Sequence, residues 1–455
     1  MRIISIILSI IFISSCSLYR KFESPKIEND NICGDNIKVD TTSTLDSSYL
    51  AWQGMFPDTN LQSLITKALE ENTDLKLAKL NIDQAEAALL SSKLSYLPSF
   101  FLSPQGGINK VGSNAASYSY NVPISAQWEL DIWGRIRNTK EQSKSALFQS
   151  QEYKKLVQTQ IVSTVANLYY TLIFLDQQLS ITLKTVRNQK ENLDVVIAMK
   201  EAGFQTETAV NQAQAAYYSI LSNSKDISKE ISLVENNLSL ILNESPSKIA
   251  RSSFDKIKEL GIEVKREIPI VALANRPDVK ISEYNLSRAF YGVNIARSAF
   301  YPNISIGAGI GWTNSLGGAI IDPAAFLYSA IASLTQPLFN KGINVANLKI
   351  AKAEYEKSLL SFEHSILSAG NEVNSILTNY FNSIDKVELR SKQVIASKQA
   401  YENSVALMQH SSMTYLEVLL SETMYLNAQL AQAADWLEKQ QSSINLYRAL
   451  GGGVE

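Results

Sequence analysis

The stretch that decides the fold is Ser117–Gly134, "SYSYNVPISAQWELDIWG". Apolar side chains occupy every second position from Tyr118 to Ile132, while the positions between them are polar apart from Pro123. Strict alternation of this kind predicts a β-strand with one apolar and one polar face. The strand therefore needs two different environments, one on each side.

Composition excludes several classes of protein. The chain has 455 residues, of which 45% are hydrophobic, and a net charge of -2. This hydrophobic fraction is too low for a bundle of membrane helices, and the charge gives no reason to expect nucleic acid as a partner. Two cysteines and two histidines argue against a disulfide framework or a zinc cluster.

Sequence patterns for catalysis are missing as well. There is no glycine–lysine phosphate loop and no serine-elbow pattern. His364 and His410 lack the spacing to acidic residues or cysteine that a metal site requires. We therefore expect neither an enzyme nor a bound cofactor or metal.

The N-terminus, "MRIISIILSIIFISSC", carries one positive charge, a short apolar run and then small residues. It predicts a signal peptide over residues 1–15, too short to span a bilayer as a helix. Small residues followed at once by Cys16 resemble a bacterial lipobox, which implies cleavage before Cys16 and a covalent lipid on it. The alternative is an ordinary signal with a chance cysteine.

Two long stretches are almost free of helix breakers. No proline lies between Pro123 and Pro246, and none follows Pro337. Apolar residues there recur at steps of three and four, the spacing of a coiled-coil seam. The expected helices are 135–201, 205–242, 343–409 and 414–450.

The chain repeats itself. "NTDLKLAKL" at Asn72 has a counterpart in "RPDVKISEY" at Arg276, and Gly134 matches Gly342. Each half is expected to run helix, two strands, long helix, turn, helix. The expected segments are an N-terminal extended segment 16–56, a first repeat 57–242, a linker 243–268, a second repeat 269–450 and a tail 451–455; the expected strands are about 99–110, 117–132, 303–315 and 324–338.

Four strands per chain cannot close a barrel, and an open sheet in lipid leaves backbone groups unpaired. We therefore expect several chains to pool their strands into one closed barrel with lipid outside and water inside. Trp128 and Trp312 are then candidates for the aromatic girdle, and Gln127, Glu129 and Asp131 for the lumen. The alternative for Glu129 and Asp131 is capping of the helix that follows.

These features resemble the TolC-like outer-membrane efflux proteins in their lipid-anchored branch. The resemblance runs from about Trp52 to Gly453, with "WELDIWGRIR", "ANRPDVKISEYNL", "TYLEVLLSE" and "LYRALGGG" in the expected order. It implies a mainly α fold with a membrane β-barrel part: a homotrimer whose helices form a periplasmic α-barrel and whose strands form a twelve-stranded outer-membrane barrel. It also implies a passive gated duct that serves a periplasmic adaptor protein and an inner-membrane transporter.

In this family the two helix–helix turns lie at the periplasmic tip. The resemblance places Gly203, Phe204 and Gln205 in the first turn, and His410, Ser411, Ser412 and Met413 in the second. His410 can change its charge near neutral pH; the alternative is an ordinary exposed histidine.

Three functions remain open at this point. The leading one is the outer-membrane channel of a tripartite pump that exports drugs or other small molecules. The second is the channel of a type I protein-secretion system, which uses the same duct. The third is a coiled-coil lipoprotein that transports nothing.

Overall fold

The computed structural model describes residues 20–25, 38–40, 52–257, 260, 267–269, 273–313, 326–409 and 415–452. The chain divides into two compact units. We call them the sheet unit (Met1–Glu28, Leu80–Glu152 and Lys280–His364) and the helical unit (Asn29–Lys79, Tyr153–Val279 and Ser365–Glu455). Helices dominate and one larger sheet accompanies them, which confirms the predicted fold class.

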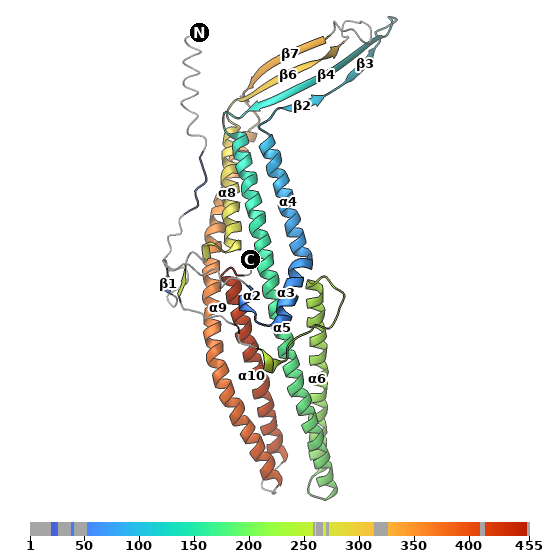
Figure 1. Ribbon diagram of the computed structural model, residues 1–455, viewed down its shortest axis with the longest axis vertical. Helices are drawn as coiled ribbons and strands as arrows, with labels where there is room; N and C mark the ends of the chain where they lie inside the picture. Colours follow the sequence, from blue (N-terminus) through green and yellow to red (C-terminus); the bar gives the residue numbers. More distant parts are fainter. Residues whose placement is uncertain are drawn as a thin grey trace. The chain divides into compact units, whose positions relative to one another are not determined.

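Two long helices repeat at equivalent places in the two halves. α5 (Arg135–Glu201) and α9 (Ile343–Gln409) each have 67 residues. Each continues through a turn into a helix of 35 residues, α6 (Glu207–Ile241) or α10 (Tyr415–Ala449). A helix of 67 residues is about 100 Å long at about 1.5 Å per residue. Figure 1 shows α5 beside α6 and α9 beside α10.

Glycine permits the entry into both long helices. Gly134 (φ 74°) directly precedes α5, and Gly342 (φ 79°) directly precedes α9. Side-chain-bearing residues are strained at these positive φ angles, whereas glycine is not. The duplicated glycines are therefore backbone requirements of the turn into each helix.

The main sheet belongs to the sheet unit. Its order is β2-β4-β6-β7, with β3 also pairing β4, and every pair is antiparallel. The central strands are paired on both sides (Figure 1). The strands are β2 (Ser99–Leu102), β3 (Gln105–Asn109), β4 (Ser117–Leu130), β6 (Asn303–Thr313) and β7 (Phe326–Thr335).

The first expected strand, 99–110, is in fact two. The strand is interrupted at Ser103 and Pro104: the Ser103 N–H still donates to the carbonyl of Pro123 on β4 (3.2 Å), but proline has no N–H to donate. A second difference is a parallel pair, β1 (Lys38–Asp40) with β5 (Glu267–Pro269). The described residues thus contain seven strand segments where the sequence predicted four.

The single helix expected before the first strands is also divided. After α2 (Trp52–Met55), the helices α3 (Thr59–Glu71) and α4 (Thr73–Leu94) meet at Asn72. The Asn72 side chain accepts hydrogen bonds from the backbone N–H groups of Asp74 (2.9 Å) and Leu75 (3.2 Å). This cap starts a new helix, because it satisfies N–H groups that have no intrahelical partner. In the second half one helix, α8 (Pro277–Ser298), precedes the strands.

The helical unit has the main core. Tyr169, Tyr170 and Leu172 of α5 are fully buried there with Leu238 of α6. Arg251 holds the linker to this core: it donates to Asp176 of α5 (2.6 and 2.9 Å) and to Glu235 of α6 (2.6 Å). A single guanidinium therefore joins the linker to both helices. The linker also forms a short 3₁₀ turn, Phe254–Lys256.

The glycines of β6 offer a matched pair of variants. A Cβ on Gly311 would lie 2.4 Å from the carbonyl oxygen of Val122, whereas a Cβ on Gly307 would lie 3.8 Å from its nearest neighbour. We expect Gly311→Ala to force β6 away from β4 and to cost about 1–3 kcal/mol. Gly307→Ala should stay within about 0.5 kcal/mol. Thermal unfolding of the two detergent-solubilised variants measures this, and equal midpoints would contradict the close approach.

Candidate functional site

One face of the main sheet is apolar from edge to edge. Residues directly opposite each other in an antiparallel pair point to the same side. The register places Val122 opposite Trp312, and Trp312 opposite Phe326. The face carries Phe100, Leu102, Ile108, Tyr118, Ile124, Trp128, Ile306, Ile310, Trp312, Phe326, Tyr328 and Leu334, all of them exposed.

The exposure of this face is the unusual property. Tyr328 is 81% exposed and Phe100 71% exposed. Monomeric soluble proteins rarely leave a continuous apolar patch of this kind in water. The face therefore requires a cover, either lipid or another protein surface.

The opposite face is mostly polar or small. Gln127 lies opposite Gly307, and Glu129 opposite Ser305. Three large apolar residues interrupt it: Phe101, Leu327 and Ile331. Sequence alternation missed them because β2 is short and β7 alternates weakly. The two on β7 stand opposite glycines of β6.

The two tryptophans named from the sequence lie on the apolar face at different heights along the strands. Trp312 pairs with Val122, and Trp128 lies six residues further along β4. At about 3.3 Å per residue this separates them by about 20 Å. Membrane barrels carry an apolar band about 25 Å tall between two aromatic girdles. The Trp128 indole also donates to the carbonyl of Tyr96 (2.8 Å). Their girdle role stays a prediction.

Asp131 lies beyond the end of β4 and not on the strand. Its carboxylate accepts hydrogen bonds from the backbone N–H groups of Ile136 and Arg137, both at 2.8 Å. Both N–H groups belong to the first turn of α5, where the helix supplies no acceptor of its own, so Asp131 has the capping role weighed as the alternative. Glu129 pairs with Arg135, whose Nε donates at 2.8 Å.

The first helix–helix turn is closed by glycine. Gly203 (φ 81°) donates to the carbonyl of Lys200, and Phe204 donates to that of Met199. These two hydrogen bonds together form a Schellman motif at the C-terminal end of α5. Phe204 is 77% exposed, and Gln205 is partly exposed. His410, Ser411, Ser412 and Met413 of the second turn, and Cys16, lie outside the described residues.

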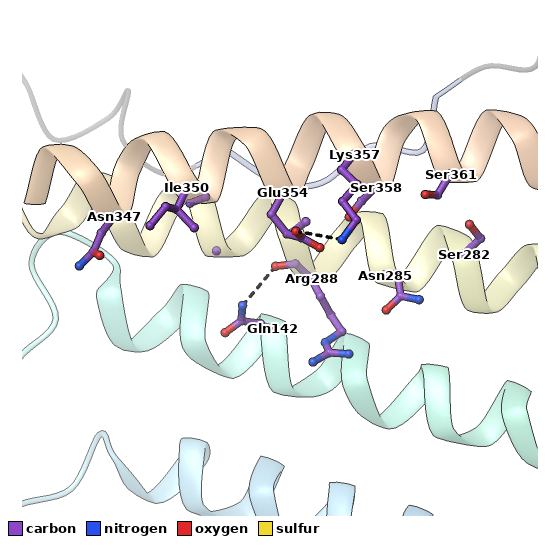
Figure 2. A pocket seen from close by; sticks show the side chains of 13 residues that line it. Gln142, Ser282, Asn285, Arg288, Asn347, Ile350, Glu354, Lys357, Ser358 and Ser361 are labelled. Carbon is purple, nitrogen blue, oxygen red and sulfur yellow. Dashed lines mark hydrogen bonds and ion pairs between the residues drawn. The ribbon is translucent and has the colours of Figure 1, made fainter.

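A groove of about 640 Å³ lies in the sheet unit between α5, α8 and α9. Figure 2 shows Gln142 of α5 donating to the backbone of Arg288, and Glu354 beside Lys357 on α9. Ile350, on the α9 wall, is 67% exposed. The groove is thus lined mainly by polar side chains, with the exposed apolar side chain of Ile350 on its α9 wall.

Ionic contacts join the helices of the helical unit. Asp435 of α10 is buried and accepts from Arg390 (2.7 Å) and Lys386 (3.0 Å) of α9. Glu422 of α10 is equally buried but bonds to amides of α5. Sequence reasoning missed both, because acidic residues in a helical repeat are ordinarily solvated.

Two negative findings apply to the described part of the chain. No helix there is long and apolar enough to cross a membrane. No three His, Cys, Asp or Glu side chains there converge in a way that would hold a metal ion.

Comparison with known proteins identifies relatives along most of the chain. The family model "Outer membrane efflux protein" matches residues 64–244 and 269–452. The cation efflux system protein CusC of Escherichia coli O157:H7 is 27% identical over 405 residues, which is 88% of each chain. The probable outer membrane lipoprotein SilC of Salmonella typhimurium is 24% identical over 406 residues, again 88% of each.

A solved structure has the same fold. A crystal structure of CusC superposes with a TM-score of 0.85 at 25% identity and covers 96% of this chain and 100% of that one. The family match spans both repeats and contains the described strands of the main sheet as well as the long helices. The chain therefore belongs to the outer membrane efflux protein family and is an outer-membrane efflux channel.

Proposed function

We propose that three copies of the chain form a passive, gated duct through the outer membrane. The observation that carries this is the main sheet, apolar and exposed on one face and mostly polar on the other. One edge of the sheet is formed by β2 and β3, and the other edge by β7. Each of these edge strands is paired on one side only. If β2 and β3 are counted as one strand of the barrel, three copies supply twelve strands, and these can close into a barrel without an open edge. Closure is necessary because unpaired backbone groups are not tolerated in the hydrocarbon of a bilayer. The apolar face then contacts lipid, and the polar face lines the lumen.

The helices of the sheet unit support the same assembly. α9 exposes Ile343, Val345 and Leu360 besides Ile350 on the groove wall (Figure 2). Such residues in water favour burial against another copy. A homotrimer covers them and continues the duct below the barrel.

The duct has no energy source of its own, so the proposal includes an inner-membrane transporter and a periplasmic adaptor protein. The adaptor meets the turn with Gly203, Phe204 and Gln205, and the second turn outside the described residues. A partner opens the duct only if it binds the open arrangement of the helices better than the closed one.

Small solutes are the preferred cargo, because the relative CusC is described as a cation efflux protein. A type I secretion channel is the alternative. Deleting the gene should raise susceptibility to some members of a panel of metal salts and toxic organic compounds. Secretion of large proteins should stay normal. Unchanged susceptibility together with lost protein secretion would favour the alternative.

Glu129 and Asp131 are expected to behave differently. Neutralising Glu129 on the polar face leaves Arg135 unpaired, so Glu129→Gln should shift the reversal potential in a KCl gradient toward anion selectivity. Asp131→Ala should leave selectivity unchanged and instead lower stability by about 0.5–2 kcal/mol, the usual cost of replacing a capping side chain by alanine. Planar-bilayer recordings and thermal unfolding separate the two effects. Unaltered selectivity in Glu129→Gln would remove Glu129 from the lumen.

The lipid on Cys16 belongs to the proposal as well, and the relative SilC is described as a probable lipoprotein. Cells fed an alkyne-tagged palmitate should label the wild-type protein and not the Cys16→Ala variant. Equal labelling of the two would refute lipidation at Cys16.

A further inference from the structure

The end of the main sheet that adjoins the helices differs in charge from the strands themselves. Glu129 is the one charged residue in the described strands β2, β3, β4, β6 and β7. The starts of β2 and β6 both pair with the end of β4, Ser99 with Gln127 and Ile304 with Leu130, and the start of β6 pairs with the end of β7. The ends of α4, α5, α8 and α9 therefore meet the sheet on one side, which we call its helix-side end (Figure 1).

Tyr96 lies at this helix-side end, in the link between α4 and β2. The indole N–H of Trp128, a residue of the apolar face, donates to the carbonyl of Tyr96 (2.8 Å). This hydrogen bond fixes Tyr96 next to the apolar face. Tyrosine and tryptophan together are typical of the boundary between lipid and water, because each has an apolar ring and a polar group.

Three basic residues lie close to Tyr96. The ammonium group of Lys140 on α5 lies over the Tyr96 ring, 6.0 Å from its centroid. Arg137, one turn earlier on α5, forms a side-chain hydrogen bond with Tyr96. Lys93 is exposed in the last turn of α4, and its carbonyl accepts from the Tyr96 N–H (3.4 Å). We call Lys93, Tyr96, Trp128, Arg137 and Lys140 the Tyr96 cluster.

The acidic residues nearby do not balance these three cations. The carboxylate of Asp131 is engaged with backbone N–H groups of α5, and Glu141 pairs with Lys140 at 3.4 Å. Lys93 has no ion-pair partner among the described residues. Three cations therefore meet two carboxylates, and the cluster is net positive.

Helix stability does not explain the cations of α5. Its first turn contains Arg135 and Arg137 and no acidic residue. A cation at a helix N-terminus is unfavourable, because the helix dipole is positive there. Arg135 pairs with Glu129 of the polar face, whereas Arg137, two positions further and so on a different side of the helix, meets Tyr96. The position of Arg137 thus indicates a negatively charged partner on the apolar side.

An independent contact places the N-terminal segment at the same height. The buried side chain of Asn294 on α8 donates to Asn138 Oδ1 (3.2 Å) and to the carbonyl of Arg20 (3.4 Å), and Asn138 directly follows Arg137. Cys16 lies four residues before Arg20, outside the described residues. Four residues of extended chain reach about 14 Å at most. A lipid on Cys16 therefore enters the bilayer near the height of the Tyr96 cluster.

We propose that the Tyr96 cluster binds the phosphate group of an anionic phospholipid in the membrane leaflet next to the helices. The proposal rests on the proposed contact between lipid and the apolar face. Lys93, Arg137 and Lys140 pair with the phosphate oxygens through charge-assisted hydrogen bonds. The acyl chains lie along the apolar face beyond Trp128.

A phospholipid fits this position better than a free anion or a second copy of the chain. A free anion leaves the adjacent apolar side chains in water, whereas acyl chains cover them. A second copy joins the sheet at its edge strands, but Trp128 belongs to β4, which is paired on both sides. The cluster therefore lies beside a part of the face that lipid covers.

The test is native mass spectrometry of the full-length protein in detergent, titrated with dioleoylphosphatidylglycerol or dioleoylphosphatidylcholine. We expect one phosphatidylglycerol per chain to bind at least about fivefold more tightly than phosphatidylcholine, the effect of one basic residue near an anionic surface. Added salt should reduce this preference, because it screens the charges. Equal affinity for the two lipids would overturn the proposal, as would displacement of phosphatidylglycerol by inorganic phosphate.

Variants with matched charge locate the site. Replacing both Arg137→Gln and Lys140→Gln should lower the affinity for phosphatidylglycerol by up to about fivefold for each cation removed. The exchange Arg137→Lys with Lys140→Arg keeps both charges and should retain most of the binding. Lys110→Gln, an exposed cation beside β3 at the other end of the sheet, is the control and should bind as the wild type does. Wild-type affinity in the double glutamine variant would refute the site.

The trimer mass and the conductance in planar bilayers report the proposed duct independently of the lipid. A conducting trimer without a preference for phosphatidylglycerol would overturn the lipid site and leave the duct standing. A double glutamine variant that dissociates into single chains, yet binds phosphatidylglycerol as the wild type does, would assign the cluster to a contact between copies and refute the lipid site.

Discussion

Hydrogen bonding at the edges of the main sheet is the constraint on which the rest of the structure depends. The central strands β4 and β6 are paired on both sides, whereas the edge strands β2, β3 and β7 are paired on one side only. In water an open edge is tolerable, but in lipid each unpaired backbone group costs several kcal/mol. A sheet whose exposed apolar face requires lipid must therefore close with other copies. This explains why the alternation in "SYSYNVPISAQWELDIWG" is so regular: successive side chains along the strand contact lipid and water in turn.

The two junctions from strand to helix show what duplication preserved and what it did not. Gly134 and Gly342 keep the same positive φ, because the chain needs that conformation to enter each long helix. The acidic cap is present only at the first junction, where Asp131 binds the start of α5. Gly134 and Gly342 are 208 residues apart, and at this offset the counterpart of Asp131 is Phe339, which is 88% exposed. Backbone geometry was retained, while side-chain chemistry was free to diverge.

Sequence periodicity predicted the long helices and the alternating strands, because both depend on local patterns. It could not predict the division at Asn72, where one side chain caps a new helix, or the pairing of β1 with β5, which are far apart in the chain. At the candidate site, alternation identified the apolar face but gave two readings for Asp131, since a strand end and a helix start overlap there. Glu422 escaped notice because burial depends on which helices pack together.

Three carboxylates of the helical unit, Glu372, Asp435 and Glu422, differ in how the fold compensates their charge. Glu372 accepts from Arg276 and Arg448 (both 2.5 Å), and Asp435 from Lys386 and Arg390, so each joins helices through paired charges. Such pairs satisfy the carboxylate within the fold. Glu422 has amides in place of cations, and one of its oxygens faces no described donor. Packing alone does not require an acid there, since glutamine would make the same bonds without the cost of charge. Burial raises the pKa of Glu422 to about 7, so near neutral pH a proton neutralises this carboxylate in a large fraction of molecules, and no cation of the chain is needed.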